Sequence, residues 1–168
     1  MFVYDIVKAS VETAAPTPGY TTNGTANTLS THLRATTAAS RGAAIQGIYL
    51  QGRGAGLTTI SGISVRVIRP GALGTGGTAA TPRPRDPSAP AAVTTPFSDT
   101  SAITPGTTPT IQLLLGCGAA GPGGWVAPNP DSGIYCEPGG AAAKGSFEVA
   151  SGSGTISLGF DMSVEYQE

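Results

Sequence analysis

Charged side chains are scarce in this 168-residue chain. Nine Lys and Arg and ten Asp and Glu make up 11% of it, and the formal net charge is −1. A phosphate backbone would require a clustered basic face, so we expect no nucleic-acid partner. The scarcity of charge also excludes a coiled coil and a charged disordered tail. It leaves little to keep an isolated protomer soluble, which favours a protein that works in an assembly.

The residues of common active sites are also in short supply. His32 is the only histidine, and the chain has no Gly-x-Ser-x-Gly elbow, so we expect no Ser-His-Asp triad. No C-x-x-C or H-x-x-x-H spacing predicts a metal, and the ten acids form no favoured pair for glycoside hydrolysis. Residues 74–79 fit a dinucleotide fingerprint formally, but Pro82 and Pro84 exclude the helix that would bind the pyrophosphate. We expect no enzyme, with no catalytic residue and no cofactor.

The chain has only two cysteines and no long apolar run. The spacing of Cys117 and Cys136 would allow a disulfide but does not require one, and two buried free thiols are expected. No stretch approaches 18 apolar residues, so we expect no membrane partner. Residues 1–8 lack the basic segment of a signal peptide, which argues against standard export.

Glycine and proline are abundant, with 25 and 14 residues, and apolar residues recur with period two rather than 3.6. The alternation is clearest in 63–69 and 156–166. Strands are expected at 2–8, 29–37, 43–51, 60–69, 110–116, 124–127, 133–136, 145–150 and 155–166. The pattern predicts one all-β domain over residues 1–168, nearly free of helix. A β-sandwich or barrel with long Gly/Pro-rich loops is expected, with a jelly roll as the leading topology.

One segment, residues 70–109, is so rich in proline that we expect an extended irregular loop. Forty irregular residues need partners for their backbone groups, so we interpret the segment as a contact arm, with a solvated loop as the alternative. Its charged residues Arg83, Arg85 and Asp86 are candidate interface residues that would pair across a subunit boundary.

The supply of core residues is thin. Leu, Ile, Val and Phe together make about 19% of the chain. Burial between protomers would extend such a core, so we predict a homo-oligomer, most simply a trimer. Trp125, the only tryptophan, is a further candidate interface residue; it would close the core or anchor an interface, with stacking on a sugar ring as the alternative.

Several runs together resemble a known group of proteins. They are AIQGIYL at 44–50, VRVIR at 65–69, TPRPRDPSAPAA at 81–92, GWVAP at 124–128 and the closing alternating strand. In this order they resemble small structural proteins encoded beside the major capsid gene of tailed bacteriophages. The resemblance implies a head decoration, or cement, protein that is made in the host cytoplasm. Such a protein sits on the outer capsid surface of the virion and clamps neighbouring major capsid subunits, often as a trimer.

A second function remains open on the sequence alone. A virion adhesin or tail component that binds a host glycan would also need no catalytic group. Electron microscopy separates the two hypotheses, since density over the whole head indicates a cement protein and density at a tail tip indicates an adhesin.

Overall fold

The computed structural model describes residues 2–11, 29–52, 62–72, 74–104, 106–107, 110–118, 121–139, 143–152 and 160–168. Within them the regular structure is antiparallel β, apart from two 3-10 turns, η1 (Pro130–Ser132) and η2 (Ala143–Gly145). The strands are β1 (Val3–Val11), β2 (Leu29–Thr36), β3 (Ala43–Gly52), β4 (Gly62–Arg69), β5 (Thr75–Ala79), β6 (Arg83–Pro84), β7 (Thr95–Thr104), β8 (Thr110–Gly118), β9 (Pro122–Val126), β10 (Ile134–Cys136), β11 (Ser146–Gly152) and β12 (Phe160–Gln167). The predicted all-β fold is confirmed.

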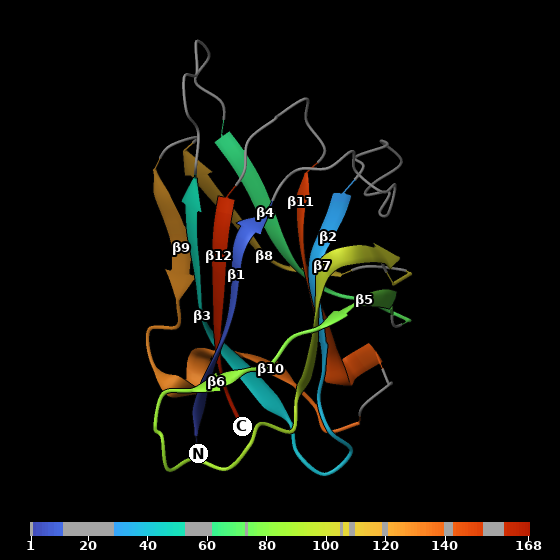
Figure 1. Cartoon of the computed structure of the whole chain (residues 1–168), viewed down its shortest axis with the longest axis vertical. Coiled ribbons are helices and arrows are strands. Elements are labelled where there is room, and N and C mark those ends of the chain that lie inside the picture. Colours follow the sequence, from blue (N-terminus) through green and yellow to red (C-terminus); the bar gives the residue numbers. More distant parts are fainter. Residues whose placement is uncertain are drawn as a thin grey trace.

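The strands pack as a sandwich of two sheets with jelly-roll connectivity (Figure 1). One sheet contains β2-β11-β4-β8 in neighbouring order, and the other contains β1-β12-β3-β9. Along these eight strands the chain changes sheet at every step except between β4 and β8, which are neighbours in the first sheet. Two interleaved Greek keys of this kind define a jelly roll, as expected from the sequence.

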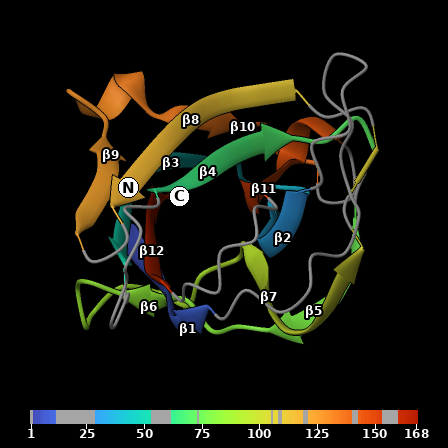
Figure 2. The ribbon, with the colours of Figure 1, turned by 90° about the horizontal axis from the view of Figure 1, so that it is seen from above.

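Additional strands widen each sheet to six. β7 and β5 extend the first sheet beyond β2, whereas β6 lies beside β1 and β10 beside β3 in the second. The two sheets are joined at one corner through β8 and β9, which pair there at Cys117 and Gly123. Seen from above, the strands surround the core as a flattened ring, with β5 and β6 on the side away from β8 (Figure 2).

The core lies between the inner faces of the two sheets. Alternation places every second residue inward, so β12 contributes Met162, Val164 and Tyr166 to the core while Asp161, Ser163 and Glu165 face outward. Tyr166 stacks on Tyr4, with ring centroids 5.6 Å apart. The remaining fully buried apolar residues of this cluster come from both sheets: Ile6, Leu33, Ala35, Ala43, Ile45, Ile48, Leu50, Val65, Val67, Cys136, Phe147 and Val149.

All nine strands expected from the alternation are present, although residues 60–61 and 155–159 lie outside the described residues. Residues 38–44, which have a helix-compatible composition, form a turn closed by an Ala38–Arg41 bridge and then enter β3. No helix in the described part of the chain is long and apolar enough to cross a membrane.

The expectation of irregular chain throughout residues 70–109 is wrong, because β5, β6 and β7 all lie there. The glycines and the proline within these strands lie at positions that a β-ladder tolerates. Gly76 and Gly77 adopt positive φ values of 79° and 84°, and the register of β5 against β7 shifts at this point. Pro84 lies in the edge strand β6, where a missing N–H leaves no ladder bond unmade. The segment therefore extends both sheets.

Candidate functional site

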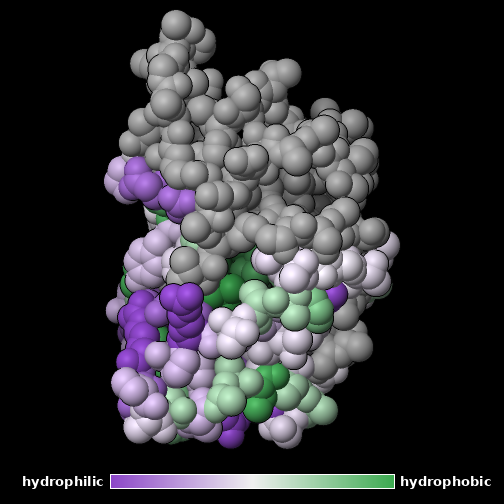
Figure 3. Space-filling view, viewed as in Figure 1, coloured by the Kyte–Doolittle hydropathy of each residue, from purple (hydrophilic) through white to green (hydrophobic). Residues whose placement is uncertain are grey.

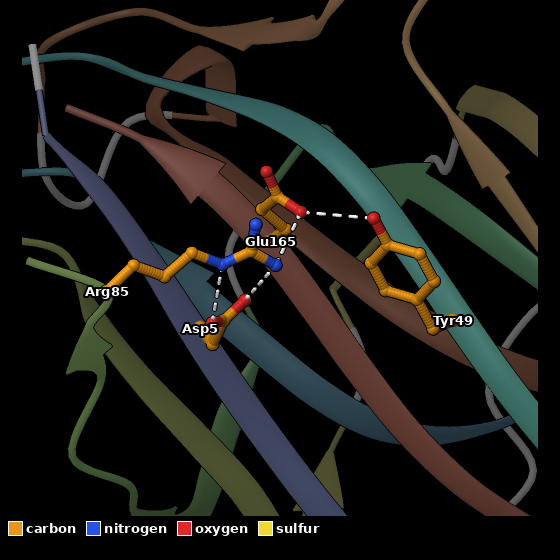
Figure 4. Close-up of polar contacts among 4 residues, drawn as sticks. All are labelled: Asp5, Tyr49, Arg85 and Glu165. Carbon is orange, nitrogen blue, oxygen red and sulfur yellow. Dashed lines mark hydrogen bonds and ion pairs between the residues drawn. The ribbon is translucent and has the colours of Figure 1, made fainter.

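Arg85 is the centre of a polar network on the outer face of the second sheet (Figure 4). Its Nε donates to Oδ2 of Asp5 at 3.0 Å, and its second terminal nitrogen lies 2.8 Å from Oε2 of Glu165. The Glu165 oxygen also accepts from the hydroxyl of Tyr49 at 3.1 Å. The network therefore ties the segment after β6 to β1, β12 and β3.

The alternation of the strands brings these groups together. Asp5 pairs with Glu165 in the β1–β12 ladder, and directly opposed residues project to the same face. Two carboxylates would repel each other there, and the guanidinium of Arg85 lies between them. The hydrogen bond to Asp5 raises the pKa of Arg85 above its ordinary value, partly opposed by desolvation. Figure 3 shows strongly hydrophilic residues gathered at the lower left of this face, where Figure 1 places β12, β1 and β6.

The Tyr49 ring lies across Gly47 of its own strand. A Cβ on Gly47 would come within 3.0 Å of the ring, so the glycine makes room for the aromatic side chain. Burial first, and then the hydrogen bond to Glu165, raises the pKa of Tyr49. The ring is still 41% exposed, and it forms a platform at the end of the Arg85 network.

Arg83 and Asp86 lie beside Arg85, as the sequence predicts. Arg83 is exposed and pairs with Asp5 through the β6–β1 backbone ladder. Asp86 accepts from the backbone and hydroxyl of Ser88 at 2.8 and 2.7 Å, and these bonds lower its pKa. Arg85 and Asp86 thus have partners within their own chain, whereas the sequence predicted partners across a subunit boundary. A contact role for residues 70–109 stays a prediction.

Trp125 lies apart from these three residues. It belongs to β9, which is separated from β6 by β3, β12 and β1 in the sheet order. Its half-buried ring packs against the core cluster, opposite Ile48 in the β9–β3 ladder. This position agrees with a core-closing role more than with an open sugar platform.

The exposed large apolar side chains cluster by strand. Of the six among the described residues, five belong to β8, β9, β3 and β10, which are neighbours in the sheet: Ile111, Leu114, Val126, Tyr49 and Tyr135. Val126 pairs with Gly47, the residue beneath the Tyr49 ring. We call these five residues the apolar corner, because their four strands are paired neighbours on either side of the corner at which β8 and β9 join the two sheets. The sixth, Val93, belongs to the segment after β6.

A second polar centre lies on the outer face of the first sheet. Glu148 of β11 is completely buried there, and its Oε1 accepts from the backbone N–H of Gly106 at 2.9 Å. Gly106 is held by a short backbone pairing between Gly71–Ala72 and Thr107 that covers this face. Oε2 of Glu148 has no hydrogen-bond partner among the described residues. Desolvation raises the pKa of Glu148 to about 7, opposed by backbone bonds from Gly106 and Gly74.

Of the two cysteines and the single histidine, the structure describes the side chain of one, Cys136. Cys136 is a buried free thiol, and desolvation raises its pKa to about 11. The side chains of Cys117 and His32 lie outside the described part of the chain. Among the described residues, no three His, Cys, Asp or Glu side chains are grouped so that they could bind a metal.

Replacing Arg85 by Gln is expected to lower the free energy of unfolding by about 1 kcal/mol. The ion pairs are half exposed, so solvent screens them, but the substitution leaves Asp5 and Glu165 facing each other. Urea unfolding at low and high salt measures the change, and the loss should shrink at high salt. Arg83→Gln, on the same exposed edge, is the matched control. Equal losses for the two variants would contradict the network.

The sequence pattern did not point to Asp5, Tyr49, Glu165 or Glu148 as site residues. For Asp5 a signal existed, since it alternates with Phe2, Tyr4 and Ile6 and so had to face away from the core. Gly47 two residues before Tyr49 was a weaker signal, because an aromatic beside a glycine often covers it on a sheet surface.

Comparisons of the chain with protein-family models, with curated proteins and with solved structures found no match.

Proposed function

We propose that this protein is a structural virion protein that binds the outer surface of a phage capsid and clamps neighbouring major capsid subunits. The observation that carries the proposal is the apolar corner, whose five exposed side chains include Leu114 at 62% and Val126 at 57% exposure. Neighbouring apolar groups left in water on a chain with few charges are typical of a surface that a protein partner covers.

The jelly roll supports this proposal as a scaffold. It is a recurrent architecture of capsid proteins and of lectins, and it presents rigid strands rather than a mobile active-site loop. Clamping needs only surface complementarity, because a protein that binds the assembled lattice and not the free subunits stabilises the lattice by mass action. Repetition over many lattice sites multiplies a modest gain at each one. Assembly as a trimer would add contacts between protomers and remains part of the proposal.

The experiment is co-sedimentation of the purified protein with heads assembled from the major capsid protein encoded beside it. Leu114→Lys and Val126→Lys each introduce a charge into the apolar corner and should reduce occupancy by about 10-fold or more, as expected for a residue at an interface centre. Ala39→Lys places the same charge at an exposed apolar side chain that lies outside both the apolar corner and residues 70–109, and it should leave occupancy unchanged. Circular dichroism verifies that all three variants fold.

Two results would contradict the proposal. If heads bind Leu114→Lys and Val126→Lys as tightly as they bind the unaltered protein, another surface of the protein must contact the capsid. Absence of co-sedimentation for the unaltered protein would remove the capsid role altogether.

A glycan-binding role is the second candidate, and the Tyr49 platform is the observation that favours it. A flat, exposed ring next to a carboxylate such as Glu165 suits stacking and hydroxyl recognition. Electron microscopy of virions distinguishes the two roles, because an adhesin would give density at the tail and a cement protein density over the head.

A further inference from the structure

A cavity of about 420 Å³ opens at the end of the sandwich where β4, β8 and β10 meet, away from the Arg85 network. Its walls carry Arg69 from the end of β4, Gln112 from β8, Tyr135 and Glu137 from β10 and the residue after it, and Lys144 from η2. Cavities of this size accommodate small ligands, and the lining supplies several different polar groups.

The charges of the lining favour a ligand with one negative charge. Arg69 and Lys144 are opposed by Glu137 alone, which lies 3.8 Å from the Lys144 ammonium. The excess of one positive charge matches a single carboxylate better than a doubly charged phosphate.

Arg69 is held in place before any ligand arrives. A terminal nitrogen of its guanidinium donates to the backbone carbonyl of Tyr135, which carries no formal charge. Its Nε is buried without a hydrogen-bond partner among the described residues, so its positive charge is only partly compensated. A planar guanidinium fixed in this way is suited to bind a carboxylate.

The other side chains that line the cavity are suited to contact the hydroxyls and the ring of a sugar. The Gln112 amide both donates and accepts hydrogen bonds, and the Glu137 carboxylate accepts them, as sugar hydroxyls require. Tyr135 is 54% exposed, and its ring lies over Gly42, where an added Cβ would come within 2.7 Å of the hydroxyl. The cavity is also larger than one acidic amino-acid side chain requires, but a whole pyranose ring fits its volume.

We propose that this cavity is a binding site for an acidic sugar, a pyranose that carries one carboxylate. Arg69 binds the carboxylate, Lys144 adds positive charge, and Gln112 and Glu137 contact hydroxyls. The site lies apart from the Arg85 network and goes beyond the proposed docking on a capsid. It shares Tyr135 with the apolar corner, but its charged and amide groups do not belong to that corner, so either proposal can hold without the other.

The test is an NMR titration of the full chain with glucuronate, followed through backbone amide shifts. We expect saturable shifts at Gln112, Tyr135 and Lys144 with a Kd on the order of 1 mM, as usual for a ligand of this size. Glucose, which has the same ring without the carboxylate, should bind about 10-fold more weakly or not at all.

Substitutions of the residues that line the cavity test the role that each is expected to have in glucuronate binding. Arg69→Gln should weaken glucuronate binding about 10-fold or more, and Lys144→Gln about 3-fold. Arg83→Gln, an exposed cation outside the cavity, should leave the Kd unchanged. If Arg69→Gln does not fold, the double variant Gln112→Ala, Lys144→Gln serves instead, because both side chains are exposed, and it should weaken binding by about 10-fold.

Several outcomes would overturn the proposal. Equal binding of glucose would remove the role of the carboxylate. A capped aspartate that binds as tightly as glucuronate would identify a protein side chain as the ligand instead. Shifts outside the cavity, or no saturable binding at all, would mean that no such site exists.

Discussion

The free energy of unfolding is expected to fall by about 2–3 kcal/mol between pH 5 and pH 8, because Glu148 is buried. In the unfolded chain this carboxyl ionises near its ordinary pKa of 4.5, whereas in the fold it keeps its proton up to about 7. The protonated form is favoured by the fold, so this stabilisation is fully present below pH 4.5. It is lost as the pH rises through 7, where ionisation places a charge in a dry site.

The charged groups around Glu148 do not remove the effect. Arg34 lies opposite Glu148 in the β11–β2 ladder, but its guanidinium stacks on Phe97 at 3.8 Å and its Nε donates to Gly76 at 2.8 Å. Arg66 lies opposite Ala150, further along β11. Desolvation is therefore the largest cause of the raised pKa of Glu148.

Urea unfolding at a series of pH values measures this dependence, with Glu148→Gln as the test variant. The amide cannot ionise, so its stability should be nearly flat from pH 5 to pH 8 and should exceed that of the unaltered chain at pH 8. A slope that persists in Glu148→Gln would assign the titration to another group, and the interpretation of Glu148 would be wrong.

Phe147→Ala is expected to lower the free energy of unfolding by about 4 kcal/mol, which approaches the total stability of many domains. Phe147 is 2% exposed and is among the largest fully enclosed side chains of the core. Because this chain has few large apolar residues, neighbouring side chains cannot fill the cavity that the substitution leaves. Both the lost burial and the empty cavity therefore contribute to the loss of stability.

Denaturant unfolding of Phe147→Ala, monitored by circular dichroism, measures the loss. Leu114→Ala is the matched control, because Leu114 is 62% exposed and its truncation should change stability by no more than about 0.5 kcal/mol. Similar losses in the two variants would show that Leu114 is buried in solution, for instance between protomers. A loss below about 1.5 kcal/mol for Phe147→Ala would mean that the core repacks.

The strands of the jelly roll could be predicted where one face is apolar and the other polar. Val65 and Val67 of β4, and Met162, Val164 and Tyr166 of β12, alternate with polar residues because each strand has one face against the core. β5 and β7 could not be predicted in this way. β5 has Gly76 and Gly77 and buries none of its residues, so its pairing with β7 rests on backbone bonds that leave no apolar pattern.

The polar networks were harder to predict for a different reason. Arg85 and Asp5 are 80 positions apart, and Tyr49 and Glu165 are 116 apart, so their meeting depends on the register of three strands. A single sequence shows which residues face outward but not which strands are neighbours. Glu148 gave no sign of its burial, because an outward position on a strand is normally wet and here a short pairing from residues 70–107 covers it.

The position of β12 between β1 and β3 limits when this protein can fold. Val164 lies opposite Ile6 on one side and opposite Ile48 on the other, so β1 and β3 are not joined in the second sheet until β12 has been synthesised. A nascent chain emerging from the ribosome would carry β1 and β3 with unpaired inner edges, and such edges recruit strands from other chains. Completion of this sheet therefore waits for the synthesis of β12, and high expression levels would favour aggregation before β12 is inserted.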